Sequence, residues 1–436
     1  MSDLHKLQYW LDRVEDLTRE MGLTFYPQKF ILCSKEKMLE KQVHHGGYYM
    51  YSHWSFGKQF TIDKILYEHK FFFLPYEMVV NTNPCEAFLL GENPLVYNIL
   101  IAAHVYAHND FFRHNKAFNE TQPERIQRQI RRGCDLIDGH AEDHKIGPGK
   151  VVKLLDAAHA AMFTNCGQGP HVRRGTILDF IVENAQSLES WELDILRFIQ
   201  TVSGHLMPQL RTKVMNEGWA TFWHYQMLRK LEKEIRTKLS FDDYFQAYQL
   251  HLSVIRLGQE DITVLNPYRI GFATWSKIAE THGVPFAFNV RQSQTDHEFL
   301  LDHFNGQDFI YKWFVKPGYV DKILARSPRI KPWDVIPPND RADRIADFTE
   351  LVRKSVWGNG TPRFQLSVKY IDNKPALVIK HQFDGRLLNQ NQIAGTLKLL
   401  NYLWRGKIIL QTRKLHQGKA EPAEWKCFDG DKIIVS

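Results

Sequence analysis

The segment that most constrains how this chain can fold is "SPRIKPWDVIPPNDR", residues 327–341, which holds four prolines in fifteen residues. Because proline fixes φ and lacks an amide hydrogen, this segment cannot continue a helix or a central strand. Before it, apolar residues recur at helical spacing in 150–165, 176–200, 207–232, 242–257 and 270–281. After it, two helices (341–356 and 388–403) alternate with the β-rich runs "RFQLSVKYI", "PALVIKHQF", "GKIILQTRK" and a terminal hairpin. We therefore predict an α+β chain with three parts: a mainly helical domain (1–325), a proline-rich linker (326–340) and a small α+β domain (341–436).

Two local features add detail to this organisation. Asn93 and Pro94 predict the start of a helix that runs past His104 and His108, with the asparagine as N-cap. Extended segments are expected around Phe71 to Val80, and Asn266 is placed to cap a further helix.

Charge does not point to nucleic acid as the partner. The 56 lysines and arginines against 49 aspartates and glutamates give a net charge of +7, but the basic residues are spread along the chain. Nucleic-acid binding needs a basic stripe or a recognition motif, and neither is present in the sequence. We therefore expect a peptide or protein, as substrate or as partner, and not nucleic acid.

The sequence predicts a cytoplasmic protein. Its five cysteines form no C-x-x-C pair and leave one unpaired in any disulfide scheme, which favours a reducing compartment. The first twenty residues have the pattern of an amphipathic helix and not of a signal peptide. No run of eighteen apolar residues is available for a membrane span.

Common catalytic motifs are missing. The four Gly-Lys pairs lack the upstream glycine of a phosphate-binding loop, no G-x-S-x-G occurs, and no G-x-G-x-x-G follows a strand. A P-loop ATPase, a serine hydrolase of the elbow type and a Rossmann enzyme are therefore disfavoured.

The residues that suggest chemistry are two histidines in "IAAHVYAHNDFF". His104 and His108 are four residues apart on a predicted helix, about 40° apart around its axis and roughly 6 Å apart along it. Two imidazoles so placed can bind one metal. This is the spacing of H-E-x-x-H zinc sites, although Val105 replaces the glutamate that serves as general base.

A third ligand is available in "KVMNEGWATFWH". Glu217 would complete a His₂Glu set for a divalent metal, with zinc as the expected ion. Gly218 and Ala220 are small enough to let another helix approach closely. His224 lies about 20° from Glu217 around the axis but about 10 Å along it, which suggests substrate contact or proton transfer and not ligation of the same metal.

The sequence does not single out one residue as the catalytic base. With Val105 in the glutamate position, a hydrolytic mechanism needs another base, and the candidates are Asp110, Tyr106 and His224. The simpler interpretation is that the histidines and the glutamate form a hydrogen-bonded polar cluster inside a helical core.

Taken in order, the motifs resemble those of a known family. "YSHWSFGKQF", "YEMVVNTNPC", "HVYAHNDFFRHN", "KVMNEGWATFWH", "NPYRIG", "KHQFDGRLLN" and "LNYLW" are similar to segments of the bacterial stage V sporulation protein R (SpoVR-like) family. The resemblance runs from about residue 40 to the C-terminus.

The resemblance implies a zincin-like fold for the helical region and a bacterial role in spore cortex or coat formation, or in stress physiology where no spores form. The family's His-x-x-x-His and Asn-Glu-Gly motifs fall on His104, His108 and the tripeptide Asn216–Gly218. Ala107 stands where the family is expected to favour glycine, and Arg113-His114 varies the segment after "DFF". Both departures leave the two histidines intact.

Two functions follow as hypotheses. The first is a metal-dependent enzyme that hydrolyses or transfers amide bonds of envelope or spore peptide material. The second is a non-catalytic assembly or regulatory protein that keeps a zincin-like core, with Val105 marking lost hydrolysis.

Overall fold

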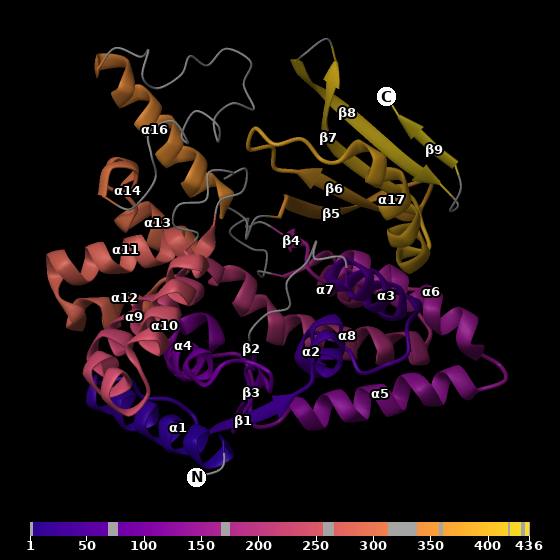
Figure 1. Ribbon diagram of the computed structural model, residues 1–436. Helices are drawn as coiled ribbons and strands as arrows, with labels where there is room; N and C mark the ends of the chain where they lie inside the picture. The colour runs from indigo at the N-terminus through magenta and orange to yellow at the C-terminus, as the bar shows by residue number, and fades with distance from the viewer. Residues whose placement is uncertain are drawn as a thin grey trace. The chain divides into compact units, whose positions relative to one another are not determined.

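The computed structural model of the chain describes residues 3–68, 77–166, 175–255, 266–312, 338–356, 361–416, 419–428 and 432–435 (Figure 1). These residues are mostly helical, with a sheet built largely from the C-terminal part, in agreement with the predicted α+β class. The zincin-like part of that prediction stays a prediction. Contacts group the chain into two units, each made of three segments. The first unit is Met1–Gly46, Ile62–Glu124 and Pro208–Trp357, and the second is Gly47–Thr61, Arg125–Met207 and Gly358–Ser436.

The first unit contains a small three-stranded sheet. Strand β3 (Cys85–Leu90) lies in the centre, parallel to β1 (Gln28–Cys33) and antiparallel to the edge strand β2 (Glu77–Val80). Ala87 and Leu89 of β3 pack against Ile101 and Val105 of α4 (Leu95–His114) in a buried apolar cluster. One face of α4 is therefore occupied by the sheet.

The core of the first unit is formed by helices that surround α9 (Lys213–Lys238). Helix α9 contacts α4, α10 (Phe241–Val254) and α11 (Pro267–His282), and α1 (Asp3–Glu20) lies against α4. Where α9 and α11 cross, a Cβ atom on Gly218 would lie only 2.3 Å from the Cα atom of Gly271. The two backbones can approach so closely because glycine has no side chain.

The starts of the core helices depend on specific side chains. Asn266 caps α11 as predicted, since its side-chain oxygen accepts a hydrogen bond from the amide of Tyr268 at 2.9 Å. The predicted cap of α4 is wrong by one residue: Pro94 is the N-cap, and the side chain of Asn93 donates to another asparagine side chain 3.2 Å away. Asp296 accepts hydrogen bonds of 2.8 Å from two backbone amides in the first turn of α9.

The second unit packs helices against a six-stranded sheet. Its strands follow chain order: β4 (Asn165–Cys166), β5 (Arg363–Ile371), β6 (Lys374–His381), β7 (Ile408–His416), β8 (Lys419–Phe428) and β9 (Lys432–Val435). Neighbouring strands are antiparallel except for β4 with β5 and β6 with β7, which are parallel. Helix α17 (Gln390–Trp404) contacts β7, β8 and α6 (Gly147–Ala161). Helices from the middle of the chain thus share a unit with the C-terminal strands.

Further helices of the described residues complete the two units. They are α2 (Lys35–Val43), α3 (Trp54–Glu68), α5 (Ile126–Glu142), α7 (Ile177–Asn184), α8 (Ser190–Arg211), α12 (Val284–Ser293), α13 (Asp296–His303), α14 (Gly306–Lys312) and α16 (Pro338–Ser355), with 3₁₀ turns at His45–Gly47 and Lys116–Phe118. Among these described helices, none combines the length and the apolar character needed to cross a bilayer.

The predicted linker falls mostly outside the described residues. Of 326–340, only the residues from Pro338 onward are described, and they begin α16. The division of the chain at this point therefore stays a prediction. Part of the predicted extended segment Phe71 to Val80 also lies outside the described residues, and β2 forms its end.

Candidate metal centre

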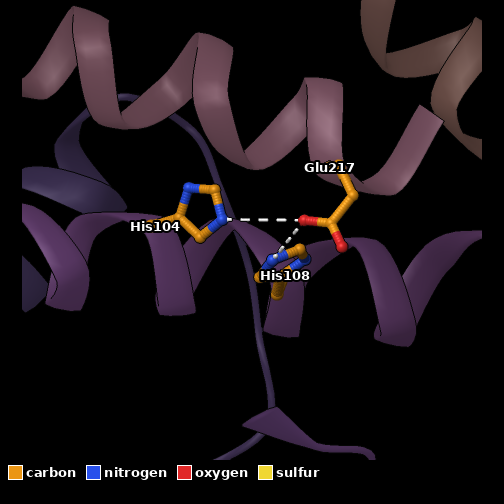
Figure 2. Close-up of side chains that lie close together, drawn as sticks. All are labelled: His104, His108 and Glu217. Carbon is orange, nitrogen blue, oxygen red and sulfur yellow. Dashed lines mark ion pairs between the residues drawn. The ribbon is translucent and has the colours of Figure 1, made fainter. Parts of the chain in front are cut away.

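Helices α4 and α9 lie side by side and bring His104, His108 and Glu217 together (Figure 2). His108 Nε2 is 3.4 Å from Glu217 Oε2, and His104 Nε2 is 3.9 Å from the same oxygen. One ligand atom from each residue lies within 4.8 Å of the other two. The two histidines are about one helical turn apart, which places both imidazoles on the face of α4 toward α9. The structure thus brings together the three residues predicted as metal ligands.

The spacing of these atoms suits a divalent metal. Two ligand atoms bound to a tetrahedral zinc at about 2.0–2.1 Å lie roughly 3.4 Å from each other. The observed separations of 3.4 and 3.9 Å are at or slightly above that value. In addition, His104 Nε2 is buried and has no hydrogen-bond partner within the described part of the chain. A buried polar atom left in this way costs on the order of 1–3 kcal/mol, and a bound metal would remove that cost.

Hydrogen bonds to the opposite ring nitrogens orient both imidazoles. His108 Nδ1–H donates to the side-chain oxygen of Asn216 at 2.8 Å. Nδ1 of His104 shares a hydrogen bond of 2.8 Å with Nδ1 of His224. Bonding at Nδ1 leaves Nε2 of each ring directed at Glu217, the arrangement in which metal-bound histidines are usually held.

The charges in the cluster are mutually stabilising. Burial alone would lower the pKa of His108, but its hydrogen bond to Glu217 and the charge of that carboxylate raise it overall. Burial alone would raise the pKa of Glu217, and its interactions with the two imidazoles outweigh that effect and lower the pKa well below the usual range. Glu217 is therefore ionised at neutral pH, as a metal ligand must be.

Two further residues of the cluster were not predicted from the sequence. Glu77, at the start of the edge strand β2, places Oε1 3.9 Å from His104 Nε2, and burial raises the pKa of this carboxyl. Tyr268, in the first turn of α11, stacks on His104 with ring centroids 6.2 Å apart. The charge of Glu217, followed by burial and a hydrogen bond to that carboxylate, raises the pKa of Tyr268 well above its usual value. Glu77 and Tyr268 fall within two of the motifs that resemble the family, "YEMVVNTNPC" and "NPYRIG", but no helical spacing links either residue to the histidines.

His224 lies beside the cluster, as predicted, and continues it to a fourth imidazole. Its Nδ1 meets His104, and its Nε2 shares a hydrogen bond of 2.8 Å with Nδ1 of His251 in α10. Both residues are buried. Three rings are thus joined in series from the cluster into the core of the first unit.

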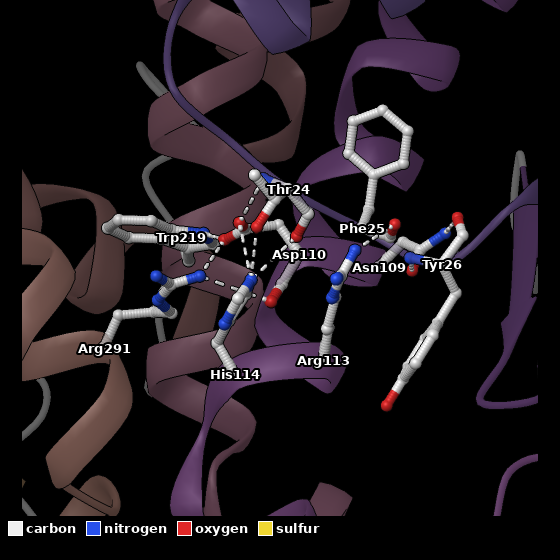
Figure 3. A network of polar contacts seen from close by, with 9 residues as sticks. All are labelled: Thr24, Phe25, Tyr26, Asn109, Asp110, Arg113, His114, Trp219 and Arg291. Atoms are coloured by element: carbon white, nitrogen blue, oxygen red, sulfur yellow. Dashed lines mark hydrogen bonds and ion pairs between the residues drawn. The ribbon is translucent and has the colours of Figure 1, made fainter.

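The other two predicted catalytic residues are placed elsewhere. Asp110 lies in a separate network, where Arg291 donates to its carboxylate at 2.6 Å and Trp219 Nε1–H donates at 3.0 Å (Figure 3). Burial raises the pKa of Asp110 to about 6, so the carboxylate is ionised beside Arg291 at neutral pH. The hydroxyl of Tyr106 donates to Glu15 of α1 at 2.9 Å. Neither residue is brought to the metal-ligand cluster.

The Asp110 network also fixes the start of the chain onto α4. The backbone amide of Thr24 donates to Asp110 at 3.0 Å, and the amide of Tyr26 donates to the side chain of Asn109 at 2.9 Å. Arg113 donates to the carbonyl oxygen of Phe25 at 2.7 Å (Figure 3). These hydrogen bonds attach the segment after α1 to α4, so the residues that make them have a structural role.

The fold and the site define the class of this protein: a mostly helical α+β protein with a His–His–Glu cluster, whose two histidines are buried, between two core helices. The chain belongs to the SpoVR-like family, because the model of that family, described as SpoVR like protein, matches residues 2–174 and 166–312. The family predicted from the motifs is thereby confirmed.

A bacterial relative of this chain is the uncharacterized protein YcgB of Escherichia coli (strain K12). The two are 30% identical over 321 residues, and the aligned region covers 62% of this chain and 62% of the relative. This chain therefore spans less than two thirds of the length of that relative. No solved structure matches the chain.

Proposed function

We propose that this SpoVR-like protein is a metal-dependent enzyme that acts on amide bonds of envelope or spore peptide material, in spore cortex or coat formation or in stress physiology. The observation that carries the proposal is the meeting of three ligand side chains around a buried, unpartnered imidazole nitrogen of His104. His104, His108 and Glu217 would hold the ion. A divalent metal bound there would polarise a carbonyl oxygen, which serves hydrolysis and amide transfer equally.

Glu77 is the residue that we assign to proton transfer. The usual glutamate position is taken by Val105, whose side chain is fully buried against β3 and cannot reach the cluster. Glu77 brings a carboxyl from β2 instead, 3.9 Å from His104 Nε2. Burial raises the pKa of this carboxyl, which favours its accepting a proton and returning it. Tyr268 has a hydroxyl beside Glu217 that can donate to an oxygen on which negative charge develops.

The first test is metal content by elemental analysis of the purified protein, with His104→Ala and Glu217→Gln beside it. We expect about one metal per chain in the wild type and loss of that metal in both variants, with unchanged circular dichroism. His114→Ala is the matched control, because His114 is on the same helix but bonds to Thr24 and should leave the metal in place. No metal in the wild type after equilibration with zinc, manganese and iron would refute the proposal.

The second test separates catalysis from metal binding. Glu77→Gln keeps the shape of the side chain and should retain the metal while amide-bond turnover falls by about 10²-fold or more. The alternative function, a non-catalytic assembly protein, is favoured by Val105 in place of the glutamate. It predicts that a metal-loaded Glu77→Gln variant supports the biological role as well as the wild type does.

A further inference from the structure

Three polar side chains of the second unit lie in series: Ser55, His53 and Asp156. Oγ of Ser55 is 2.7 Å from Nδ1 of His53, and Nε2 of the same ring is 3.3 Å from Oδ1 of Asp156. Ser55 is in the first turn of α3, and Asp156 is on α6. The motif "YSHWSFGKQF", which contributes nothing to the candidate metal centre, supplies the serine and the histidine. A hydroxyl, an imidazole and a carboxylate in this order are the parts of a nucleophilic triad, which is recognised by geometry and not by sequence.

The backbone determines which nitrogen of His53 carries the proton. The amide N–H of Ser55 donates to Nδ1 at 3.3 Å, so Nδ1 is the unprotonated nitrogen. The proton of the neutral ring is then on Nε2, toward the carboxylate of Asp156. Because Nδ1 is an acceptor, the hydroxyl of Ser55 is the donor of the 2.7 Å hydrogen bond. A resting triad requires this arrangement of protons.

Burial keeps His53 in the form that can accept a proton. Its side chain is 1% exposed, and burial lowers its pKa, an effect that the charge of Asp156 opposes but does not overcome. The ring is therefore neutral at pH 7. The contact between Nε2 and Asp156 is longer and less well aligned than a good hydrogen bond, as catalytic contacts often are before substrate binds.

Capping of α3 explains only part of this arrangement. A side-chain acceptor at the residue before the helix satisfies the backbone amide of Ser55. It gives no reason for the serine hydroxyl to bond to the same nitrogen, or for a carboxylate from a second helix to lie at the opposite nitrogen of the ring. Ser55 is also partly exposed, whereas the side chain of His53 is shielded from water.

We propose that these residues form a second active site that hydrolyses carboxylic esters, with Ser55 as nucleophile, His53 as general base and Asp156 as positioning residue. Oγ of Ser55 bonds to the ester carbonyl carbon and gives its proton to Nδ1 of His53, and this proton passes to the alcohol oxygen as the ester C–O bond breaks. Water then attacks the acyl-serine and gives a proton to Nδ1, which returns it to Oγ as the acid leaves. The partial positive charge at the start of α3 favours the negative charge that develops on the carbonyl oxygen.

Trp54 indicates which acyl groups the site takes. It directly precedes Ser55 and is 55% exposed. Its Nε1–H donates to Asp156 at 3.0 Å, which holds the indole in place beside the triad. An exposed indole that is fixed in this way can bury the apolar surface of a substrate. The acyl group that we assign to the site is therefore apolar.

The first test is covalent labelling of the purified protein with a fluorophosphonate probe. An activated serine oxygen bonds to the phosphorus atom as fluoride leaves, and the added mass is located by peptide mapping. We expect one label per chain, on Ser55, in the wild type and none in Ser55→Ala. Ser52→Ala is the matched control, because this exposed serine lies in the same motif outside the triad and should leave labelling unchanged. A wild type that is labelled no faster at Ser55 than after heat denaturation overturns the proposal.

Two variants separate the triad from a helix cap. His53→Asn keeps a side-chain oxygen that can cap α3 but provides no base. Asp156→Asn keeps an oxygen that can accept from Trp54 but removes the charge. We expect the labelling rate of Ser55 to fall by about 10²- to 10⁴-fold in both, with unchanged circular dichroism. A wild-type rate in His53→Asn would show that His53 is only a cap.

Ester hydrolysis tests the acyl group and keeps this site distinct from the metal centre. The kcat/KM of p-nitrophenyl butyrate should exceed that of the acetate about tenfold, roughly the effect of burying two methylene groups, and the ratio should approach one in Trp54→Ala. An unchanged ratio in that variant would overturn the assignment of the acyl group. His104→Ala should leave both labelling and hydrolysis intact. Loss of these activities in His104→Ala would assign them to the metal centre and overturn the second site.

Discussion

The contact between α9 and α11 at Gly218 gives the sharpest prediction for stability. In Gly218→Ala, the new Cβ atom would lie 2.3 Å from Gly271 Cα, 2.4 Å from Gly271 C and 2.9 Å from the amide nitrogen of Phe272. Ordinary contact begins near 3.4 Å, so the helices must separate by about 1.1 Å. All three atoms belong to the backbone and cannot rotate away.

The size of the expected stability loss follows from two opposing effects. Overpacking of a core costs about 1–3 kcal/mol, and a clash with immobile backbone atoms belongs at the upper end of that range. Alanine in a helix interior gains about 1 kcal/mol over glycine. We therefore expect Gly218→Ala to lower the free energy of unfolding by about 2 kcal/mol. Because Trp219 and Trp275 lie at this crossing with ring centroids 4.7 Å apart, urea unfolding followed by tryptophan fluorescence is the suitable assay.

A matched substitution controls for helix propensity. Gly204 is inside α8 and has nothing within 4 Å of an added Cβ atom, so Gly204→Ala should be neutral or stabilising by up to about 1 kcal/mol. Gly271→Ala removes the same close approach from the other side, and the double variant with Gly218→Ala should cost less than the sum of the two. Wild-type stability for Gly218→Ala, or strict additivity of the pair, would refute the reasoning.

Three further predictions concern buried charges. Asp110→Asn leaves Arg291 buried without the carboxylate that lies 2.6 Å from it, and should lower the free energy of unfolding in urea by about 3–5 kcal/mol. Asp308→Asn, which breaks a partly exposed ion pair, should lower it by less than about 1 kcal/mol. Similar losses in both variants would contradict the role of burial. Asp296→Asn weakens two hydrogen bonds to the first turn of α9 and should lower the free energy of unfolding by about 1–2 kcal/mol. The metal content should not change. An unfolding curve equal to that of the wild type would show that the charge of the Asp296 carboxylate is not needed at the start of α9. Burial lowers the pKa of His251 in the folded protein to about 4, whereas the pKa in the unfolded chain is about 6.5. Between these two pH values the unfolded chain binds more protons than the folded protein. The stability that His251 contributes is therefore present above pH 6.5 and is lost as the pH falls to 4. The free energy of unfolding falls by at most about 3 kcal/mol over this range. In His251→Phe, the free energy of unfolding should depend less on pH between about 6.5 and 4 than in the wild type. An equal pH dependence in both proteins would exclude His251 as the titrating group.

Helical periodicity was a reliable guide wherever residues share one helix. The four-residue spacing of His104 and His108 correctly placed both on one face of α4, and carboxylate chemistry pointed to Glu217 on a second helix. The same arithmetic argues against Tyr106 and Asp110. Each lies two residues from one of the histidines, about 200° around the axis, and therefore on the opposite face of α4.

Residues that approach from other elements could not be found in this way. Glu77 lies near His104 because β2 pairs with β3 in the three-stranded sheet. No sequence pattern in β1 or β3 predicts that these two strands pair in parallel. His251 is joined to the cluster through His224, across a turn between α9 and α10. Long-range pairing of this kind depends on tertiary packing, which a single sequence does not encode locally.

The composition of the first unit has a consequence for how the protein is made. Its hydrophobic core includes Phe348 and Val352 of α16 together with Trp219 of α9. During synthesis at about 5–20 residues per second, His104 leaves the ribosome long before Glu217, and both precede the last residues of their own core. The complete core of the first unit can therefore form only after some 350 residues have been translated. Until α16 has been synthesised, the apolar surfaces that Phe348 and Val352 cover in this core lack these partners.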